Sequence, residues 1–130
     1  MRKIILLLLV FLGLLSVVSC NKKTEQPASD KSVSEAKITF IELGSVTCIP
    51  CKQMQPIMKS IEAKYAGQVK VIFYDVWKDN KPAKQYGIRL IPTQVFLDKD
   101  GKELLRHEGF FAEEEIDKFL LAQGLKITIQ

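Results

Sequence analysis

Apolar and polar positions along the first half of the chain fall into segments, and the period of each segment predicts an element. Residues 37–43, "KITFIEL", form a mostly apolar, β-branched run, which predicts a strand. From Cys51 onward, apolar residues recur at spacings of three and four, which predicts a helix with one buried face. This stripe consists of Cys51, Met54, Met58, Ile61 and Tyr65. Gly67 fits the end of the helix.

The second half of the chain adds three predicted strands and two predicted helices. Residues 69–76, "VKVIFYDV", are nearly all apolar, which predicts a strand buried on both faces. The turn "DKDG" at 98–101 separates two further short strand-like runs and predicts a hairpin. The other expected elements are a short helix at 82–86 before Gly87, strands at 93–97 and 103–108, and a closing helix at 112–123 before Gly124.

The predicted order β-α-β-α-β-β-α indicates an α/β fold. It combines a right-handed βαβ unit with an antiparallel hairpin, so we expect a central mixed sheet of about four strands with helices on both faces. The elements begin at residue 37, and residues 37–130 are enough for one domain with a modest core.

The N-terminal segment has a different pattern. After Arg2 and Lys3, residues 4–18 are apolar apart from Gly13 and Ser16. Fifteen residues are too few for a span of about 20 and are typical of a signal peptide. The segment ends "LLSVVSC", which resembles the lipobox of bacterial lipoproteins and implies a signal peptide at 1–19 and lipidation of Cys20. An uncleaved anchor and a plain secretory signal cut elsewhere are the alternatives.

Residues 20–36 are polar, with no apolar period, and we expect the lipidated cysteine and a flexible tether there. Loss of Arg2 and Lys3 leaves 17 of the 19 basic residues beside 15 acidic ones, a net charge of about +2. That charge is too small to indicate nucleic-acid binding. An exported chain also places its thiols in an oxidising compartment.

The stretch "VTCIPCK" holds Cys48 and Cys51 and allows three interpretations. A structural zinc site needs four ligands, but the chain offers no second cysteine pair and only one histidine, His107. A structural disulfide across so short a loop would contribute only about 2 kcal/mol, against about 4.7 kcal/mol for a loop of about 100 residues. Both interpretations are therefore weaker than a redox pair.

The redox interpretation rests on the position of the pair at the start of the first helix. Free N–H groups and the helix dipole favour a thiolate there, so the pKa of Cys48 should fall. The dipeptide between the cysteines is Ile49-Pro50, and proline suits a first helical turn. Lys52 adds positive charge nearby or is an ordinary solvated lysine. We expect Cys48 to be the exposed nucleophile and Cys51 the shielded resolving thiol.

Residues 38–124 resemble the thioredoxin family. "CIPCKQMQPIM" at 48–58 is similar to its active-site helix, with Pro56 at the position of its mid-helix proline. "YGIRLIPT" at 86–93 is similar to its second signature. The resemblance implies a thioredoxin fold, a cis peptide bond before Pro92, and docking of an extended substrate chain by Ile91, Pro92 and Thr93. From the residues alone, Ile-Pro is extended or turned, with a cis bond as one option.

Two more residues carry over from the family, and several positions depart from it. Glu42 stands where the family has a buried acid that assists proton movement; the alternative is a partly exposed strand glutamate. Gly109 matches a glycine that lets a substrate backbone approach, or is a plain turn glycine. Thr47 replaces the usual tryptophan before the first cysteine, which puts the usual partner surface in doubt. The family's buried lysine has no counterpart, and we expect Trp77 in packing or a loop and His107 at the surface.

The resemblance also suggests a function. Strong oxidants and isomerases of this fold carry histidine before the second cysteine, whereas Pro50 matches reducing members, whose potentials lie near about −270 mV rather than about −120 mV. We expect a monomeric, lipid-anchored, extracytoplasmic protein-disulfide reductase. It would need no cofactor or metal beyond its disulfide and would be supplied by an integral-membrane thiol electron donor. Its clients would be exported proteins, including apocytochromes c. Alternatives are an export-side oxidant or isomerase, or a metal-binding chaperone, although copper-handling relatives space their cysteines differently.

Overall fold

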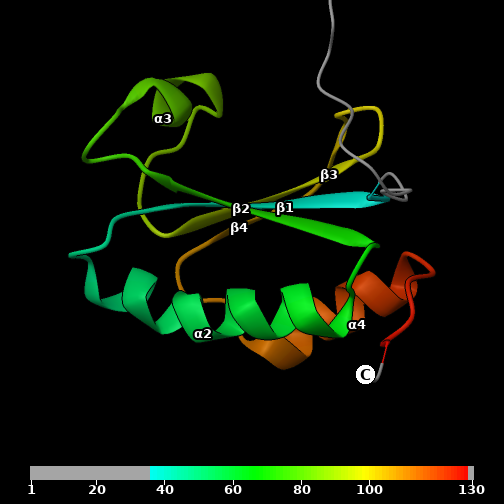
Figure 1. The fold of residues 1–130 in the computed structure, drawn as a ribbon. Helices are drawn as coiled ribbons and strands as arrows, with labels where there is room; N and C mark the ends of the chain where they lie inside the picture. The colour runs from blue at the N-terminus through cyan, green and yellow to red at the C-terminus, as the bar shows by residue number, and fades with distance from the viewer. Residues whose placement is uncertain (1–35, 129–130) are drawn as a thin grey trace, which may run out of the picture. The chain divides into compact units, whose positions relative to one another are not determined.

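The computed structural model describes residues 36–128, so the predicted signal peptide, Cys20 and nearly all of the tether lie outside the described residues. Seven elements follow one another in the predicted order (Figure 1). They are β1 (Ile38–Gly44), α2 (Ile49–Lys64), β2 (Val69–Asp75), α3 (Lys81–Gln85), β3 (Thr93–Asp98), β4 (Glu103–Glu108) and α4 (Glu113–Ala122). Over residues 36–128, no helix has the length and apolar character that a bilayer crossing requires.

The sheet has the strand order β2-β1-β3-β4. β1 and β2 are parallel, whereas β1–β3 and β3–β4 are antiparallel. Helices α2 and α4 lie on one face of the sheet and α3 lies on the other (Figure 1). The predicted α/β class, with a mixed four-stranded sheet covered on both faces, is therefore confirmed.

Alternation along the strands divides the apolar side chains between two cores. Phe40 and Phe96 stack in the larger core, where the buried stripe of α2 and Ile116 and Leu120 of α4 cover them. Ile41, Leu43 and Val95 point to the other face and pack with residues around α3. The predicted helical stripe is confirmed, since all five of its side chains are buried.

Strand β2 corrects one expectation. The sequence predicts a strand buried on both faces, but only Val69 is fully buried and the following residues are partly exposed. Its side chains do alternate between the two cores, with Val71 and Phe73 in one and Ile72 and Tyr74 in the other. Within the described residues, however, β2 is an edge strand paired only with β1, so its outer side is not covered.

The C-terminal end of α2 is fixed to α4 by a group of polar contacts that we name the α2–α4 clamp. Lys64 Nζ lies 2.6 Å from both Glu113 Oε1 and Asp117 Oδ2. The buried Tyr65 hydroxyl donates to Asp117 Oδ1 at 3.0 Å. Burial, helped by this bond, raises the pKa of Tyr65 to about 12. Lys64 and the Ser60 hydroxyl, which donates to Glu113 Oε1, hold the pKa of Glu113 below its usual range.

Candidate active site

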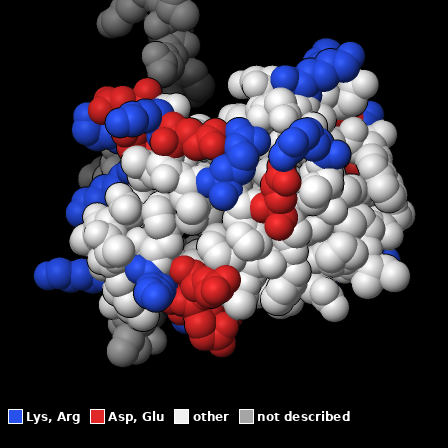
Figure 2. Space-filling view, turned by 180° about the vertical axis from the view of Figure 1, so that it is seen from behind, with Lys and Arg blue, Asp and Glu red and all other residues white. Residues whose placement is uncertain are grey.

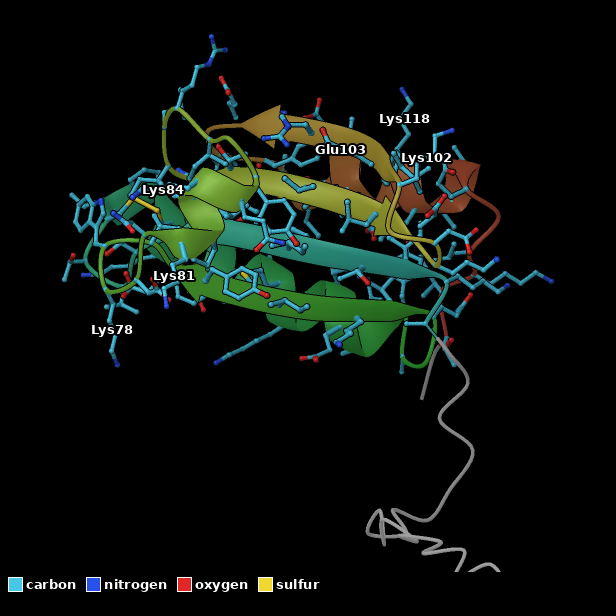
Figure 3. All side chains as sticks on the ribbon, turned by 90° about the horizontal axis from the view of Figure 1, so that it is seen from above. Lys78, Lys81, Lys84, Lys102, Glu103 and Lys118 are labelled. Carbon is cyan, nitrogen blue, oxygen red and sulfur yellow. A yellow bond between two sulfur atoms is a disulfide. The ribbon has the colours of Figure 1, made fainter. Side chains whose placement is uncertain are left out.

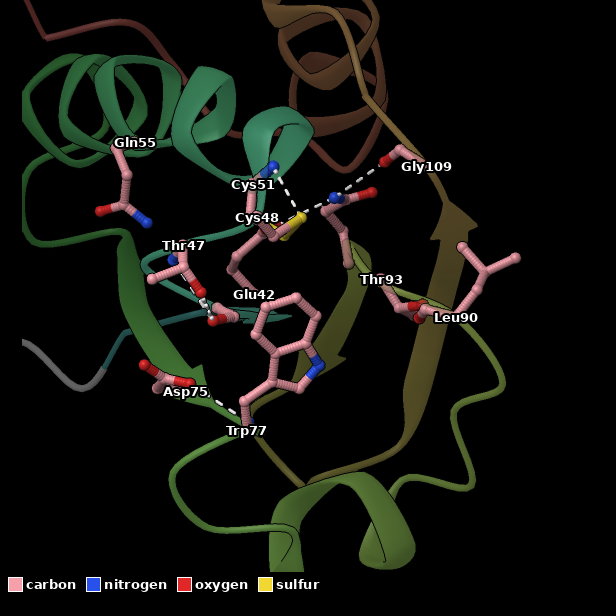
Figure 4. The surroundings of a disulfide bond; sticks show 12 residues. Glu42, Thr47, Cys48, Cys51, Gln55, Asp75, Trp77, Leu90, Thr93 and Gly109 are labelled. Atoms are coloured by element: carbon pink, nitrogen blue, oxygen red, sulfur yellow. Dashed lines mark hydrogen bonds between the residues drawn. A yellow bond between two sulfur atoms is a disulfide. The ribbon is translucent and has the colours of Figure 1, made fainter.

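Cys48 and Cys51 form a disulfide at the first turn of α2 (Figure 4). Cys48 is the N-cap residue, and its Sγ accepts a hydrogen bond from the Cys51 N–H at 3.4 Å. Pro50 lies in the first helical turn, where its missing N–H is not needed. The same backbone N–H that now faces Cys48 sulfur would stabilise a Cys48 thiolate after reduction.

The accessibility of the two sulfurs differs less than the sequence suggests. Cys51 is fully buried on the core-facing stripe, as a shielded thiol should be. Cys48, expected to be exposed, has an exposed fraction of only 9%. The loop before α2 is a tight turn at the buried Ser45: its Oγ accepts from Thr47 N–H, and its carbonyl accepts from Cys48 N–H. Cys48 is still the more accessible of the two cysteines.

Gly44, at the end of β1, lets the disulfide pack directly on the sheet. A Cβ at this position would lie 3.1 Å from both Cβ and Sγ of Cys51 and 3.3 Å from the Phe73 ring. These distances are shorter than ordinary van der Waals contacts. Gly44 was not among the predicted site residues. Its place between a predicted strand and the cysteine pair was the sequence feature that could have indicated its role.

Glu42 lies on the same face of β1 as Gly44, two residues earlier, and has no exposed surface. Its side chain lies near the disulfide in Figure 4. Burial raises its pKa to about 8, although a hydrogen bond from Gln94 opposes part of this rise. The alternative of a partly exposed strand glutamate is thereby excluded. A carboxyl with this pKa can take up or release a proton close to neutral pH.

Gln94, in β3, is the second residue of the site that was not predicted from the sequence. It pairs with Glu42 across the β1–β3 ladder and is fully buried. Its Nε2 donates to Glu42 Oε2 at 2.9 Å and to the Gly109 carbonyl at 3.1 Å. A polar residue inside the apolar run "TQVFL" was the only signal of this role.

The second predicted motif lies beside the disulfide. The Ile91–Pro92 peptide bond is cis. Thr93 is buried, and its hydroxyl donates to the Leu90 carbonyl at 2.8 Å, so it fastens the loop. Gly109 donates its N–H to the Pro92 carbonyl at 2.8 Å and has φ of +96°, which disfavours any side chain there. Figure 4 shows Leu90, Thr93 and Gly109 around the disulfide.

Exposed apolar side chains surround this end of the sheet, and we name them the apolar rim. The rim consists of Val46, Ile49, Trp77 and Leu90, with exposed fractions of 73% for Ile49 and 65% for Trp77. Thr47, between two of them, is exposed as well. A pocket of about 320 Å³ is lined by residues 76–77, Ala83 and 88–91, and so joins Trp77 to the loop before Pro92. Trp77 therefore belongs to a loop, as expected.

Charged side chains lie at both ends of the sheet. Figure 3 shows Lys78, Lys81 and Lys84 at the disulfide end, and Lys102, Glu103 and Lys118 at the other. On the face seen in Figure 2, acidic and basic side chains are intermixed over the left half, and the lower right, on the side where α2 begins, holds few charges. Lys52 is exposed to solvent. No single-sign surface is visible on this face.

His107 is partly buried on β4 rather than fully at the surface. Its ring stacks on Phe111 with a centroid distance of 4.0 Å, and Nε2 lies 3.1 Å from the Phe110 carbonyl oxygen. Between residues 36 and 128, no three side chains of His, Cys, Asp or Glu gather closely enough to hold a metal ion. The expectation of a metal-free site stays a prediction.

Comparisons with known proteins agree with this geometry. The family model "Thioredoxin" matches residues 20–122. The chain is 26% identical to thioredoxin C-2 of Corynebacterium nephridii over 106 residues, 82% of this chain and 96% of that protein. It is 30% identical to thioredoxin of Chlamydia trachomatis over 83 residues, 64% of this chain and 79% of that protein.

A solved structure is similar as well. The germline-specific thioredoxin Deadhead of Drosophila melanogaster superposes with a TM-score of 0.61 at 27% identity, covering 68% of this chain and 83% of that one. The fold is thus the thioredoxin fold. With its disulfide at the first turn of α2 and a family match over most of its length, the chain belongs to the thioredoxin family and is a thiol–disulfide oxidoreductase.

Proposed function

We propose that this protein is a membrane-tethered reductant of disulfides in exported proteins, and that Pro50 carries the direction of electron flow. The residue before Cys51 offers neither an N–H nor a charge to the Cys48 sulfur, and within residues 36–128 this sulfur accepts a hydrogen bond from the Cys51 N–H alone. A strong oxidant of this family owes its potential to a stabilised reduced form. A weakly stabilised Cys48 thiolate therefore favours donation of electrons.

Each turnover passes two electrons to the client. The Cys48 thiolate attacks a client disulfide, whose S–S bond breaks, and the released client thiolate takes up a proton. Cys51 then gives its proton to the Glu42 carboxylate and attacks the Cys48 sulfur, so that the mixed disulfide breaks and the second client thiolate leaves. The Cys48–Cys51 disulfide must next be reduced by a donor dithiol, which we assign to an integral-membrane electron carrier.

The surface beside the disulfide suits an extended client chain. The loop of Ile91, Pro92 and Thr93 is held by the Thr93–Leu90 and Gly109–Pro92 bonds. The absence of a side chain at Gly109 leaves room for a client backbone: a Cβ built there would meet nothing within 4 Å. The apolar rim and Thr47 would contact client side chains. Thr47 stands where a tryptophan is usual, and the exposed aromatic side chains of Trp77, in the loop after β2, and Phe110, beside Gly109, would supply aromatic contacts instead.

The tether and the location rest on the N-terminal sequence alone. The basic start, the apolar run at 4–18 and "LLSVVSC" support export and lipidation of Cys20, followed by a polar spacer up to residue 36. Labelling cells with a radioactive or clickable fatty acid tests this part separately. Label on the wild type but not on Cys20→Ser supports the anchor, and equal labelling of both contradicts it.

Reductase activity is tested on the full chain carrying Cys20→Ser, so that Cys48 and Cys51 are its only thiols. We expect catalysed reduction of insulin disulfides, and its loss in Cys48→Ser. Activity that survives in Cys48→Ser would contradict the assignment. Equilibration with glutathione then gives the reduction potential, and a value above about −150 mV would reverse the proposed direction.

A further inference from the structure

One buried side chain connects the proton-carrying carboxyl to the client-docking edge. Gln94 Nε2 lies 2.9 Å from Glu42 Oε2 and 3.1 Å from the Gly109 carbonyl oxygen. Because a backbone carbonyl only accepts, the nitrogen of the amide must face Gly109. Its two hydrogens are then directed to Gly109 and Glu42. Gly109 in turn donates to the Pro92 carbonyl, so one chain of bonds joins Glu42 to the cis-proline loop.

We propose that Gln94 is a positioning residue for disulfide exchange, whose amide holds the Glu42 carboxyl in both of its protonation states while Cys51 exchanges a proton with it. This inference rests on the proposed function. It adds a residue that acts through Glu42 and touches neither sulfur.

The unpaired oxygens of the two side chains support the proposal. Glu42 Oε1 and Gln94 Oε1 are both buried, and neither has a hydrogen-bond partner among the described residues. A carboxylate supplies no donor to the amide oxygen, but a protonated carboxyl does. Protonation of Glu42 at Oε1 would turn one of these unpaired acceptors into a donor, while the Gln94 Nε2–Glu42 Oε2 bond can persist in both protonation states. An apolar residue at 94 could serve neither state, since it has neither donor nor acceptor.

The surroundings of Glu42 contain few other groups that could replace this contact. Across the sheet its row runs from Phe73 through Glu42 and Gln94 to His107. Cys51, from α2, packs against Gly44 on the same face of β1, and among the described residues no charged side chain contributes to the pKa shift of Glu42. His107 is separated from Glu42 by Gln94 and stacks on Phe111. Gln94 is thus the polar partner of the carboxyl.

The test follows the two chemical steps separately in the full chain carrying Cys20→Ser. Reduced protein is mixed with dithiobis-nitrobenzoate: attack by Cys48 releases the first coloured thiolate, and attack by Cys51 on the mixed disulfide releases the second. Gln94→Met removes the amide but keeps the side-chain length. Because the bond that the Gln94 amide donates is stronger to a carboxylate than to a neutral carboxylic acid, its loss should raise the pKa of Glu42.

We expect Gln94→Met to move the pH midpoint of the second release up by about one unit and to slow it about tenfold at pH 7, with the first release unchanged. Gln55→Met is the matched control, because Gln55 lies near the disulfide but contacts Met58 instead of Glu42. It should behave like the wild type. In a Glu42→Gln background, Gln94→Met should have no further effect on the second release.

An unchanged pH midpoint in Gln94→Met, or equal slowing with and without Glu42, overturns the inference. A wild type that shows no second release contradicts the proposed function instead, so the two failures are distinguishable. If Gln94→Met does not fold, Gln94→Leu replaces it in the same assay. A measurement on the wild type is independent of any variant: the Gln94 side-chain amide signals in nitrogen-15 NMR should titrate with the Glu42 carboxyl, and signals that do not move contradict the inference.

Discussion

The two ends of α2 differ in how well their polar groups are paired. At its C-terminal end, Lys64 and Tyr65 find partners on α4, and each carboxylate of the α2–α4 clamp receives a hydrogen bond or an ion pair. At its N-terminal end, the disulfide packs directly against Gly44. Nearby, burial raises the pKa of the Glu42 carboxyl and favours its protonated form. Two buried oxygens there, on Glu42 and Gln94, have no hydrogen-bond partner in the part of the chain that the structure describes. The comparison suggests that the clamp fixes the helix so that the other end can hold groups that are individually unfavourable.

The largest expected effect comes from replacing the buried carboxyl by Glu42→Gln. The folded pKa of Glu42, about 8, lies above its ordinary value of 4.5, so folding favours the protonated form. The stability contributed by this proton is complete below pH 4.5 and is lost as the pH rises toward about 8. Relative to Glu42→Gln, the wild type should lose up to about 1.4 kcal/mol per pH unit within this window. Urea unfolding at several pH values measures this, and parallel pH curves for the two proteins would contradict it.

Gly44→Ala tests the close packing at the same end. The new methyl group would press on Cys51 and the Phe73 ring, and the cross-linked cysteine cannot rotate away. We expect a loss of about 2–3 kcal/mol of unfolding free energy, in the upper part of the range for overpacked cores, together with slower insulin reduction. Thermal or urea unfolding of the oxidised protein gives the value. A fully stable and active alanine variant would show that the sheet can yield here.

Asp117→Ala breaks the other end of the helix. It leaves the buried Tyr65 hydroxyl without its carboxylate and removes one partner of Lys64. The expected cost is about 1–2 kcal/mol of unfolding free energy, because an unsatisfied buried hydroxyl is the main penalty. Insulin reduction under folding conditions should be unchanged. A loss of activity without loss of stability would mean that the two ends are more strongly coupled than the structure indicates.

The smallest effect on stability is expected for Trp77→Ala, in the apolar rim. The side chain is 65% exposed, so the unfolding free energy should change by no more than about 0.5 kcal/mol. Reduction of insulin should nevertheless require a higher insulin concentration, while reaction with the small dithiobis-nitrobenzoate stays at the wild-type rate. Equal losses with both substrates would place Trp77 in the chemistry rather than in client binding.

Local patterns were enough to predict most of the fold. The stripe from Cys51 to Tyr65 has a helical period, and the turn at 98–101 is set by its own residues, with Gly101 at φ of +80°. Each depends on neighbours along the chain. The cis bond before Pro92 followed from family resemblance, because the Ile-Pro dipeptide by itself allows both isomers.

The unpredicted features depend on which strands become neighbours. Gln94 meets Glu42 through a ladder between residues 52 positions apart, and periodicity shows which face a side chain takes but not what lies opposite. Likewise, the apolar run in β2 indicated packing on both faces but not its place at the sheet edge. The low exposure of Cys48 likewise depends on its three-dimensional surroundings, which the spacing of the cysteines does not encode.

The direction of β1 has a consequence for how the protein is mounted. The chain enters this strand at Ile38 and reaches the loop before the disulfide only after Gly44, at the opposite end of the sheet (Figure 1). The seven residues of β1 are separated by six steps of about 3.3 Å, so about 20 Å lies between the entry to the strand and the reactive end. At the same far end, Gln68 accepts from Lys126 N–H, and Thr128 N–H bonds to the Lys64 carbonyl. A resin or a fluorophore attached at either end of the domain would therefore lie away from the disulfide and leave it accessible.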